Sequence, residues 1–206
     1  VLSTLFDPSI FTGTPVVLSD KQIHASMQQA CNLKEVKQIR FLHNDLDSLE
    51  LKLSQYHHPD QPRFILVESV YSMSGESANL KQLVHLRNKY KAFLIVDEAH
   101  ASGVYGPEGS GLASEANLVI GTFGKAMGSF GSYVGCSKEI KNFLINKCPG
   151  FIYTTALPPS TLGSIEGSLD LVPNMQKERK HIKDLSDYLR YSLDREGYFY
   201  GNSDTH

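Results

Sequence analysis

The sequence predicts an α/β fold in which a mainly parallel central sheet is flanked by helices. Unbroken apolar runs with β-branched members, at residues 64–67, 93–96 and 118–120, are typical of strands buried on both faces. Between two of these runs, residues 80–90 repeat apolar side chains at helical spacing. Strands that alternate with helices indicate βαβ units and therefore a parallel sheet.

The first half of the chain alternates strands and helices in this way. Ser19 and Asp20 are expected to cap a helix, and His24 then lies in the first turn of that helix. His57 and His58 are adjacent in a loop, point apart and lack a third ligand, so they predict no metal site. The expected elements are a short helix over residues 1–6, strands over 16–18, 39–42 and 64–67, and helices over 20–30, 46–53 and 80–90.

The second half continues the pattern and then becomes mainly helical. The expected elements are strands over residues 93–96, 118–120 and 133–136, a helix capped by Ser137, an extended segment over 151–155, and helices from 160 to Gly197 with a break near Pro173. We place a large domain over residues 1–157, and a connecting helix with the start of a smaller C-terminal domain over residues 158–206. Because the first residue is Val1 and the last residues form a turn, we interpret the chain as the middle of a longer protein.

Composition narrows the classes of function. The 206 residues carry a formal net charge of -2, with 41% hydrophobic and 20% charged residues, as in ordinary globular domains. This balance predicts no bulk attraction to nucleic acid or to an anionic membrane. No apolar run approaches the roughly 18 residues of a membrane-spanning helix. Three widely spaced cysteines, Cys31, Cys136 and Cys148, fit a reducing compartment, so we expect a cytoplasmic protein.

Polar residues follow two neighbouring strands where each strand ends. Asp97 and His100 come after the run at 93–96, and Thr122 and Lys125 come after the run at 118–120. In open α/β sheets ligands bind outside the carboxyl ends of the strands, so these side chains are expected in one crevice. A carboxylate, an imidazole, a hydroxyl and an amine suit a cofactor with a basic ring nitrogen, a phosphate and an aldehyde. These are the groups of pyridoxal 5'-phosphate (PLP).

Two other classes of function are compatible with parts of this pattern. The sequence Asp97-Glu98-Ala99-His100 also occurs in helicases, whose phosphate loop reads Gly-x-x-x-x-Gly-Lys-[Ser/Thr]. Here Val119 stands at the first glycine position and Ala126 follows the lysine, which disfavours an ATPase. A catalytically silent PLP-fold interaction subunit is expected to lose the lysine or the aspartate, and both are present.

Five motifs in register resemble the α-oxoamine synthases, PLP enzymes of fold type I that join an amino acid to an acyl thioester with loss of carbon dioxide. The resemblance extends over essentially all 206 residues. The motifs are His24-Ala25-Ser26, Glu68-x-x-x-Ser72-Met73-x-Gly75, Asp97-Glu98-Ala99-His100-x-x-Gly103, Gly121-Thr122-Phe123-Gly124-Lys125 and Thr154-Thr155-Ala156-Leu157-Pro158-Pro159.

The resemblance implies a role for each matching residue. Lys125 would hold PLP as a Schiff base and then act as general base. Asp97 would pair with the pyridine nitrogen, and His24 would stack on the ring. His100 and Ser72 would hydrogen-bond the ring phenolate oxygen. The other two residues are implied to bind phosphate: Thr122 in its own subunit, and Thr154 in the neighbouring subunit of a homodimer.

Within this family, residues 122–126 and 151–159 look most like the member that condenses L-alanine with a pimeloyl thioester in biotin biosynthesis. The carrier of the acyl group, coenzyme A or a carrier protein, is left open. Sibling enzymes that use glycine or serine, or an autoinducer-type acyl chain, share the cofactor site and remain alternatives. The family's upstream phosphate loop and downstream carboxylate-binding arginine are expected outside residues 1–206. No nucleic acid, membrane or metal partner is implied.

Overall fold

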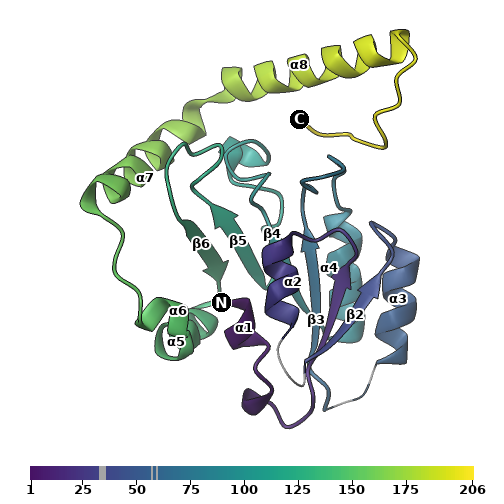
Figure 1. Ribbon diagram of the computed structural model, residues 1–206, viewed down its shortest axis with the longest axis vertical. Helices are drawn as coiled ribbons and strands as arrows, with labels where there is room; N and C mark the ends of the chain where they lie inside the picture. Colours follow the sequence, from purple (N-terminus) through teal and green to yellow (C-terminus); the bar gives the residue numbers. More distant parts are fainter. Residues whose placement is uncertain (33–35, 57, 59) are drawn as a thin grey trace.

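The computed structural model describes residues 1–32, 36–56, 58 and 60–206 and contains one six-stranded sheet (Figure 1). The strand order is β2-β1-β3-β4-β5-β6. The first five strands in this order pair in parallel, and β6 is antiparallel to β5. The strands are β1 (Val16–Asp20), β2 (Lys37–Phe41), β3 (Arg63–Glu68), β4 (Phe93–Asp97), β5 (Leu118–Thr122) and β6 (Ser132–Cys136). The mainly parallel α/β fold predicted from the sequence is confirmed.

Helices cover both faces of this sheet. The α-helices are α1 (Leu2–Leu5), α2 (Ala25–Cys31), α3 (Leu46–Gln55), α4 (Leu80–Tyr90), α5 (Lys138–Lys147), α6 (Pro149–Ile152), α7 (Pro159–Leu171) and α8 (Gln176–Arg195). Short 3-10 turns lie at η1 (Pro8–Ile10), η2 (Pro107–Gly109) and η3 (Val172–Asn174).

The buried strands separate two hydrophobic cores because successive side chains of a strand point to opposite faces. In β3, Phe64 and Leu66 pack with α1, α2 and α5, whereas Ile65 and Val67 pack with α3 and α4. All four side chains are at most 5% exposed. This double burial explains why the strand is an unbroken apolar run rather than an alternating one.

Local signals set the boundaries of several helices. Side chains of Asp45, Asn79 and Ser137 accept hydrogen bonds from the first turns of α3, α4 and α5, as expected of N-caps. Gly197 follows α8 with φ of 73°, the left-handed conformation that ends helices without a side-chain penalty. The helices predicted over 46–53, 80–90 and after Ser137 are therefore confirmed.

Two expectations about local structure were wrong. Asp20 does not cap α2, because it is the last residue of β1; His24 is the N-cap instead, and its Nδ1 accepts the backbone N–H of Ser26. Residues 151 and 152 are not extended but belong to α6, where both backbone N–H groups donate to the carbonyl of Cys148. Pro149 favours this turn because its fixed φ suits the first helical position.

The order in which the chain forms the strands determines where the sheet can bind a ligand. The chain crosses from β1 to β2 on one side and then returns to β3 on the other side of β1. Such a reversal of strand order opens a crevice at the carboxyl ends of the strands, which is where open α/β sheets bind ligands. The strand ends Asp20, Glu68, Asp97 and Thr122 lie along this edge.

The last helices lie apart from the two cores. The predicted break at Pro173 is confirmed as η3 between α7 and α8. None of the residues of α8 is buried, and the helix lies at the end of the molecule where the parallel strands finish (top of Figure 1). The boundary at residue 157 stays a prediction. Of the two adjacent histidines, His58 is exposed and His57 lies outside the described residues. Among the described residues, no helix combines the length and hydropathy needed to span a bilayer.

Two leucines of α3 provide a matched test of the hydrophobic core that lies between the sheet and helices α3 and α4. Leu53 is fully buried between α3 and the sheet, whereas Leu51 in the same helix is 56% exposed. We expect Leu53→Ala to lower the free energy of unfolding of the full-length protein by about 2–5 kcal/mol, because it leaves a cavity. Leu51→Ala should lower it by less than about 1 kcal/mol. Chemical denaturation of both variants measures the difference, and equal losses would contradict the packing described here.

Candidate active site

A cavity of about 280 Å³ lies at the carboxyl edge of the sheet, near the lower end of the size range of small-molecule sites. Residues from β3, β4, β5, β6, the N-terminus of α2 and the loops after β4 and β5 line it. We call it the active-site cavity, and its lining residues are His24, Ser26, Glu68, Asp97, Ala99, His100, Ile120, Gly121, Thr122, Lys125 and Ser132. Five of the seven predicted site residues are thus brought together: His24, Asp97, His100, Thr122 and Lys125.

Asp97 is fixed at the centre of this edge by the strand register. It is the last residue of β4 and pairs with Glu68 of β3 on one side and Ile120 of β5 on the other. Its Oδ1 atom accepts the backbone N–H of Ala99 at 2.8 Å. Burial raises the pKa of the Asp97 carboxyl, while the Ala99 N–H and the nearby Lys125 lower it.

Lys125 and His100 meet across the cavity. The Lys125 Nζ atom lies 2.7 Å from His100 Nε2. Burial lowers the pKa of His100, and the neighbouring lysine lowers it further, so the neutral ring can accept a hydrogen bond from the ammonium group. Lys125 lies in the connection between β5 and β6, which is closed by a bond from Phe123 N–H to the Gly131 carbonyl. This tight turn holds the amine beside the end of β4.

Thr122 and His24 line the cavity, and their side chains also form hydrogen bonds with nearby backbone groups. The Thr122 hydroxyl donates to the Gly131 carbonyl at 3.0 Å and accepts the Gly124 N–H at 3.1 Å. His24 caps α2, and its Nδ1 atom lies 2.9 Å from the Ser26 hydroxyl oxygen. The exposed His24 ring is therefore anchored through Nδ1.

Two predicted site residues do not line this cavity. The Ser72 backbone N–H donates to Glu68 Oε2 at 3.1 Å, which places Ser72 behind Glu68. Thr154 is exposed in the bend that follows α6. The role expected for Ser72 stays a prediction. The role of Thr154 also stays a prediction, because its expected contact involves a neighbouring subunit.

Sequence reasoning gave no role to Glu68, which is a prominent cavity residue. It is the last residue of β3 and only 2% exposed, and its Oε1 atom has no hydrogen-bond partner among the residues the structure describes. Burial is the main cause that raises the pKa of Glu68 to about 7. The signal that could have found it is the one that found Asp97, a carboxylate directly after a buried apolar strand.

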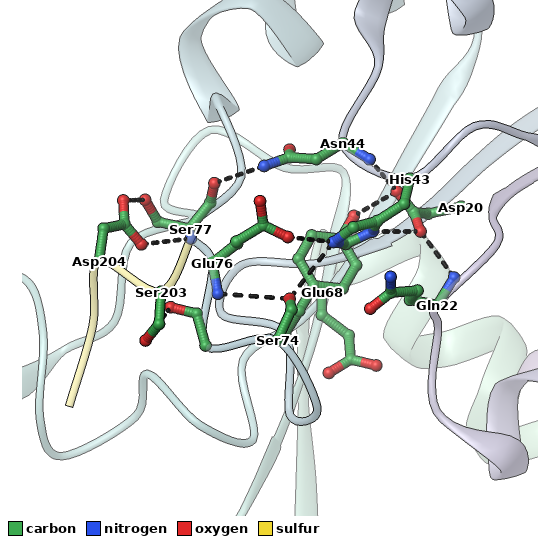
Figure 2. A network of polar contacts seen from close by, with 12 residues as sticks. Asp20, Gln22, His43, Asn44, Glu68, Ser74, Glu76, Ser77, Ser203 and Asp204 are labelled. Atoms are coloured by element: carbon green, nitrogen blue, oxygen red, sulfur yellow. Dashed lines mark hydrogen bonds and ion pairs between the residues drawn. The ribbon is translucent and has the colours of Figure 1, made fainter. Parts of the chain in front are cut away.

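A second polar cluster, built around His43, lies beside Glu68 (Figure 2). The two ring nitrogens of His43 face different carboxylates, with Nδ1 2.9 Å from Asp20 Oδ1 and Nε2 2.6 Å from Glu76 Oε2. Both contacts are hydrogen bonds only when both nitrogens carry a hydrogen. His43 also packs edge-on against the ring of Tyr71, with centroids 4.5 Å apart.

The buried Asp20 carboxylate ties three segments together in this cluster. It accepts the backbone N–H of Gln22 at 2.7 Å, the backbone N–H of Asn44 at 2.7 Å and the Tyr71 hydroxyl at 3.0 Å. Because Tyr71 directly precedes Ser72, these bonds also hold the Ser72 N–H against Glu68. The cluster therefore fixes the loop that follows Glu68.

The same loop receives the C-terminal residues. Asp204 accepts hydrogen bonds from the backbone N–H of Ser77 at 2.8 Å and from its hydroxyl at 2.5 Å (Figure 2). The Thr205 hydroxyl donates to the Gly75 carbonyl at 2.7 Å. Gly75 has φ of 67°, and a Cβ there would lie 2.4 Å from the Ser203 hydroxyl oxygen. Glycine is thus required for the close approach of the two segments.

A larger cavity of about 800 Å³ adjoins the active-site cavity and shares Ser26, Asp97, Ile120 and Ser132 with it. Apolar side chains such as Met27, Leu144 and Phe151 supply much of its wall. We place the reactive centre in the smaller cavity, because Lys125, His100 and Glu68 line that one alone.

Comparisons with known proteins agree with this arrangement. The family model described as "Aminotransferase class I and II" matches residues 3–206. The chain is 48% identical over 198 residues to the 8-amino-7-oxononanoate synthase of Gluconacetobacter diazotrophicus, covering 94% of this chain and 50% of that protein. It is 46% identical over 209 residues to a putative 8-amino-7-oxononanoate synthase of Bordetella pertussis, covering 100% of this chain and 53% of that protein. The chain thus spans about half the length of the curated relatives it matches.

Solved structures share the same fold. A serine palmitoyltransferase from S. paucimobilis with bound PLP superposes with a TM-score of 0.86 at 28% identity, covering 96% of this chain and 53% of that chain. The 8-amino-7-oxononanoate synthase of Francisella tularensis gives a TM-score of 0.83 at 27% identity, covering 98% and 60%. The chain belongs to the aminotransferase class I and II family, and the resemblance found in its motifs is confirmed by these relatives.

The His43 cluster leads to a stability prediction. Glu76 and His43 are each only 16% exposed, so Glu76→Ala should lower the free energy of unfolding of the full-length protein by about 2 kcal/mol. The exposed pair formed by Glu50 and Lys89 is the control, and Glu50→Ala should cost less than about 1 kcal/mol. Chemical denaturation compares the two. A loss for Glu76→Ala no larger than that for Glu50→Ala would show that the cluster does not hold the loop.

Proposed function

We propose that the full-length protein is a PLP-dependent acyltransferase of the α-oxoamine synthase type. The observation that carries this proposal is the convergence of Lys125, Asp97 and His100 in one cavity at the ends of two adjacent parallel strands. The structural relative with bound PLP and the relatives named 8-amino-7-oxononanoate synthase support it.

The residues present fit PLP by their chemistry. The cofactor needs an amine for its aldehyde and an acid for its ring nitrogen, and Lys125 and Asp97 supply these groups. It also needs hydrogen-bond donors: the His100 ring can provide one, and the Thr122 hydroxyl can provide another when it turns from the Gly131 carbonyl to the phosphate. When bound, PLP supplies an aldehyde that captures amino groups and a ring that accepts negative charge.

Each residue then has a definite task. Lys125 binds the cofactor and, once released, removes the proton from the α-carbon of the amino acid. Asp97 holds a proton on the ring nitrogen, a role that suits a carboxylate fixed by a strand end and by the Ala99 N–H. His24 stacks on the ring from the N-terminus of α2, and Thr122 binds phosphate. His100 and Ser72 hydrogen-bond the phenolate oxygen.

We propose L-alanine and a pimeloyl thioester as substrates and 8-amino-7-oxononanoate as product. The support is the 43–48% identity to relatives that carry this enzyme's name. A pocket that accepts alanine gains only about 1 kcal/mol from the methyl group, so discrimination against glycine should be modest. Sibling reactions with glycine or serine are the alternatives.

The working unit in this proposal is a cytoplasmic homodimer. Thr154 lies exposed after α6, where a second subunit can reach it, and it would bind phosphate in that subunit. The three cysteines are free, and two of them are buried, which suits a reducing compartment.

A helicase-type ATPase is disfavoured by the position of the lysine in the fold. A phosphate loop joins a strand to the N-terminus of a helix, whose backbone N–H groups cradle the phosphates. Lys125 instead lies in the turn between the antiparallel strands β5 and β6. The acids at residues 97 and 98 therefore have no phosphate loop beside them in the part of the chain that the structure describes.

The cofactor assignment makes a direct prediction. The purified full-length protein should absorb visible light after incubation with PLP, and borohydride reduction followed by peptide mapping should find the cofactor on Lys125. Lys125→Ala should lose this label and all turnover while keeping the fold, measured by circular dichroism. Lys141→Ala, which removes a lysine from the adjoining cavity only, should keep both. Label on any other lysine would contradict the assignment of Lys125.

The substrate assignment is tested by competition. With L-alanine, glycine and L-serine, each offered with pimeloyl, acetyl, succinyl and palmitoyl thioesters, alanine with the pimeloyl thioester should give the highest kcat/KM. Alanine should exceed glycine by about fivefold, as expected from about 1 kcal/mol for one buried methyl group. A higher kcat/KM for glycine with the acetyl or succinyl thioester would assign the protein to a sibling reaction and leave only the cofactor chemistry.

A further inference from the structure

The active-site cavity holds a second carboxyl group, Glu68, that the proposed chemistry does not use. Its two oxygens have different surroundings. Oε2 accepts the Ser72 N–H, whereas Oε1 has no partner among the described residues although the side chain is only 2% exposed. An unpaired polar atom in a buried position is costly unless a ligand or water pairs with it.

The active-site cavity offers space for such a partner. Glu68 lines it together with Asp97, and the two residues are direct neighbours in the β3–β4 register. Figure 2 shows Glu68 beside the His43 cluster, and no dashed line joins Glu68 to His43. The carboxyl group therefore faces the cavity with one oxygen available.

The groups around Glu68 favour its neutral form. Burial is the largest influence and raises its pKa to about 7, and the Asp97 carboxylate acts in the same direction. The hydrogen bond from the Ser72 N–H lowers the pKa, and the nearby backbone of His24 and positive charge of Lys125 also lower it, without cancelling the effect of burial. A neutral carboxylic acid carries an O–H donor, whereas an ionised one can only accept.

We propose that Glu68 is a substrate-binding residue that enters the active-site cavity as a neutral acid and donates a hydrogen bond from Oε1 to an oxygen of the bound substrate. This inference rests on the proposed function for the identity of the substrate. The acceptor is a carboxylate oxygen of the amino acid or the carbonyl oxygen of the acyl thioester. Either oxygen would satisfy the atom that the fold leaves unpaired.

Binding measurements on the PLP-loaded full-length protein distinguish the two acceptors. L-Alanine binding is followed by the change in visible absorption, and binding of an unreactive thioether analogue of the acyl thioester by calorimetry. Glu68→Ala should weaken one of the two ligands by about tenfold or more, as expected for a lost buried hydrogen bond, and the ligand affected identifies the acceptor. Glu68→Gln, whose amide also donates, should stay within about threefold of the wild type.

Several outcomes would overturn the proposal. Glu68→Ala could leave both substrate affinities unchanged, or it could weaken only the affinity for PLP itself. Glu68→Gln could be as impaired as Glu68→Ala, which would mean that the ionised carboxylate is needed. Glu115→Gln, at an exposed glutamate, controls for the charge change and should alter neither affinity.

Thermal unfolding without PLP tests the protonation of Glu68 separately. An unfolded glutamate titrates near pH 4.3, whereas folded Glu68 keeps its proton to about pH 7. The folded state binds more protons in this window, so wild-type stability should fall, relative to Glu68→Gln, as the pH rises from about 5 to 7. Parallel pH profiles would overturn the neutral-acid proposal, whereas a wild-type protein that takes up no PLP would overturn only the proposed function.

Discussion

The parallel register of β3, β4 and β5 is the constraint on which the site depends. It sets Glu68 beside Asp97 and Asp97 beside Ile120, so that the polar residues that end the strands face one cavity. Because side chains alternate across a strand, a slip of one residue would turn Asp97 away and present Glu98 instead. Glu98 in fact points elsewhere and accepts the backbone N–H of Leu112 at 2.8 Å. Both apolar cores serve to hold this register.

Most of the fold could be predicted because its signals are local. Buried strands are short apolar runs, and the caps Asp45, Asn79 and Ser137 precede their helices directly. The errors arose where distant contacts outweigh local preference. Asp20 resembles a helix cap in the sequence, but its carboxylate is already occupied by groups from loops that follow β2 and β3. Nothing within a few residues of Asp20 indicates those partners.

The site was predictable to the extent that it follows strand ends. Asp97, His100, Thr122 and Lys125 were found by that rule and His24 by its motif. Glu68 was part of a motif at a strand end but was given no role, although the same rule applies to it. The His43 cluster could not be predicted, because it joins residues that are far apart in sequence: His43 lies 23 positions from Asp20 and 33 positions from Glu76. Only the crossing of strand order between β1 and β3 brings their loops together.

Two buried carboxylates at this edge differ in what the fold provides for them. Asp20 has two backbone N–H groups, a tyrosine hydroxyl and the His43 ring around it, so both of its oxygens are occupied. Glu68 has a hydrogen bond on one oxygen, and its second oxygen has no partner among the residues that the structure describes. A fully bonded carboxylate stabilises the loops it joins, whereas a partly bonded one in a cavity is stabilised only when a ligand completes it. At the same edge of the sheet, Asp20 thus has a structural role, whereas Glu68 is available for binding. The loop that contains Tyr71 and Ser72 contacts both carboxylates.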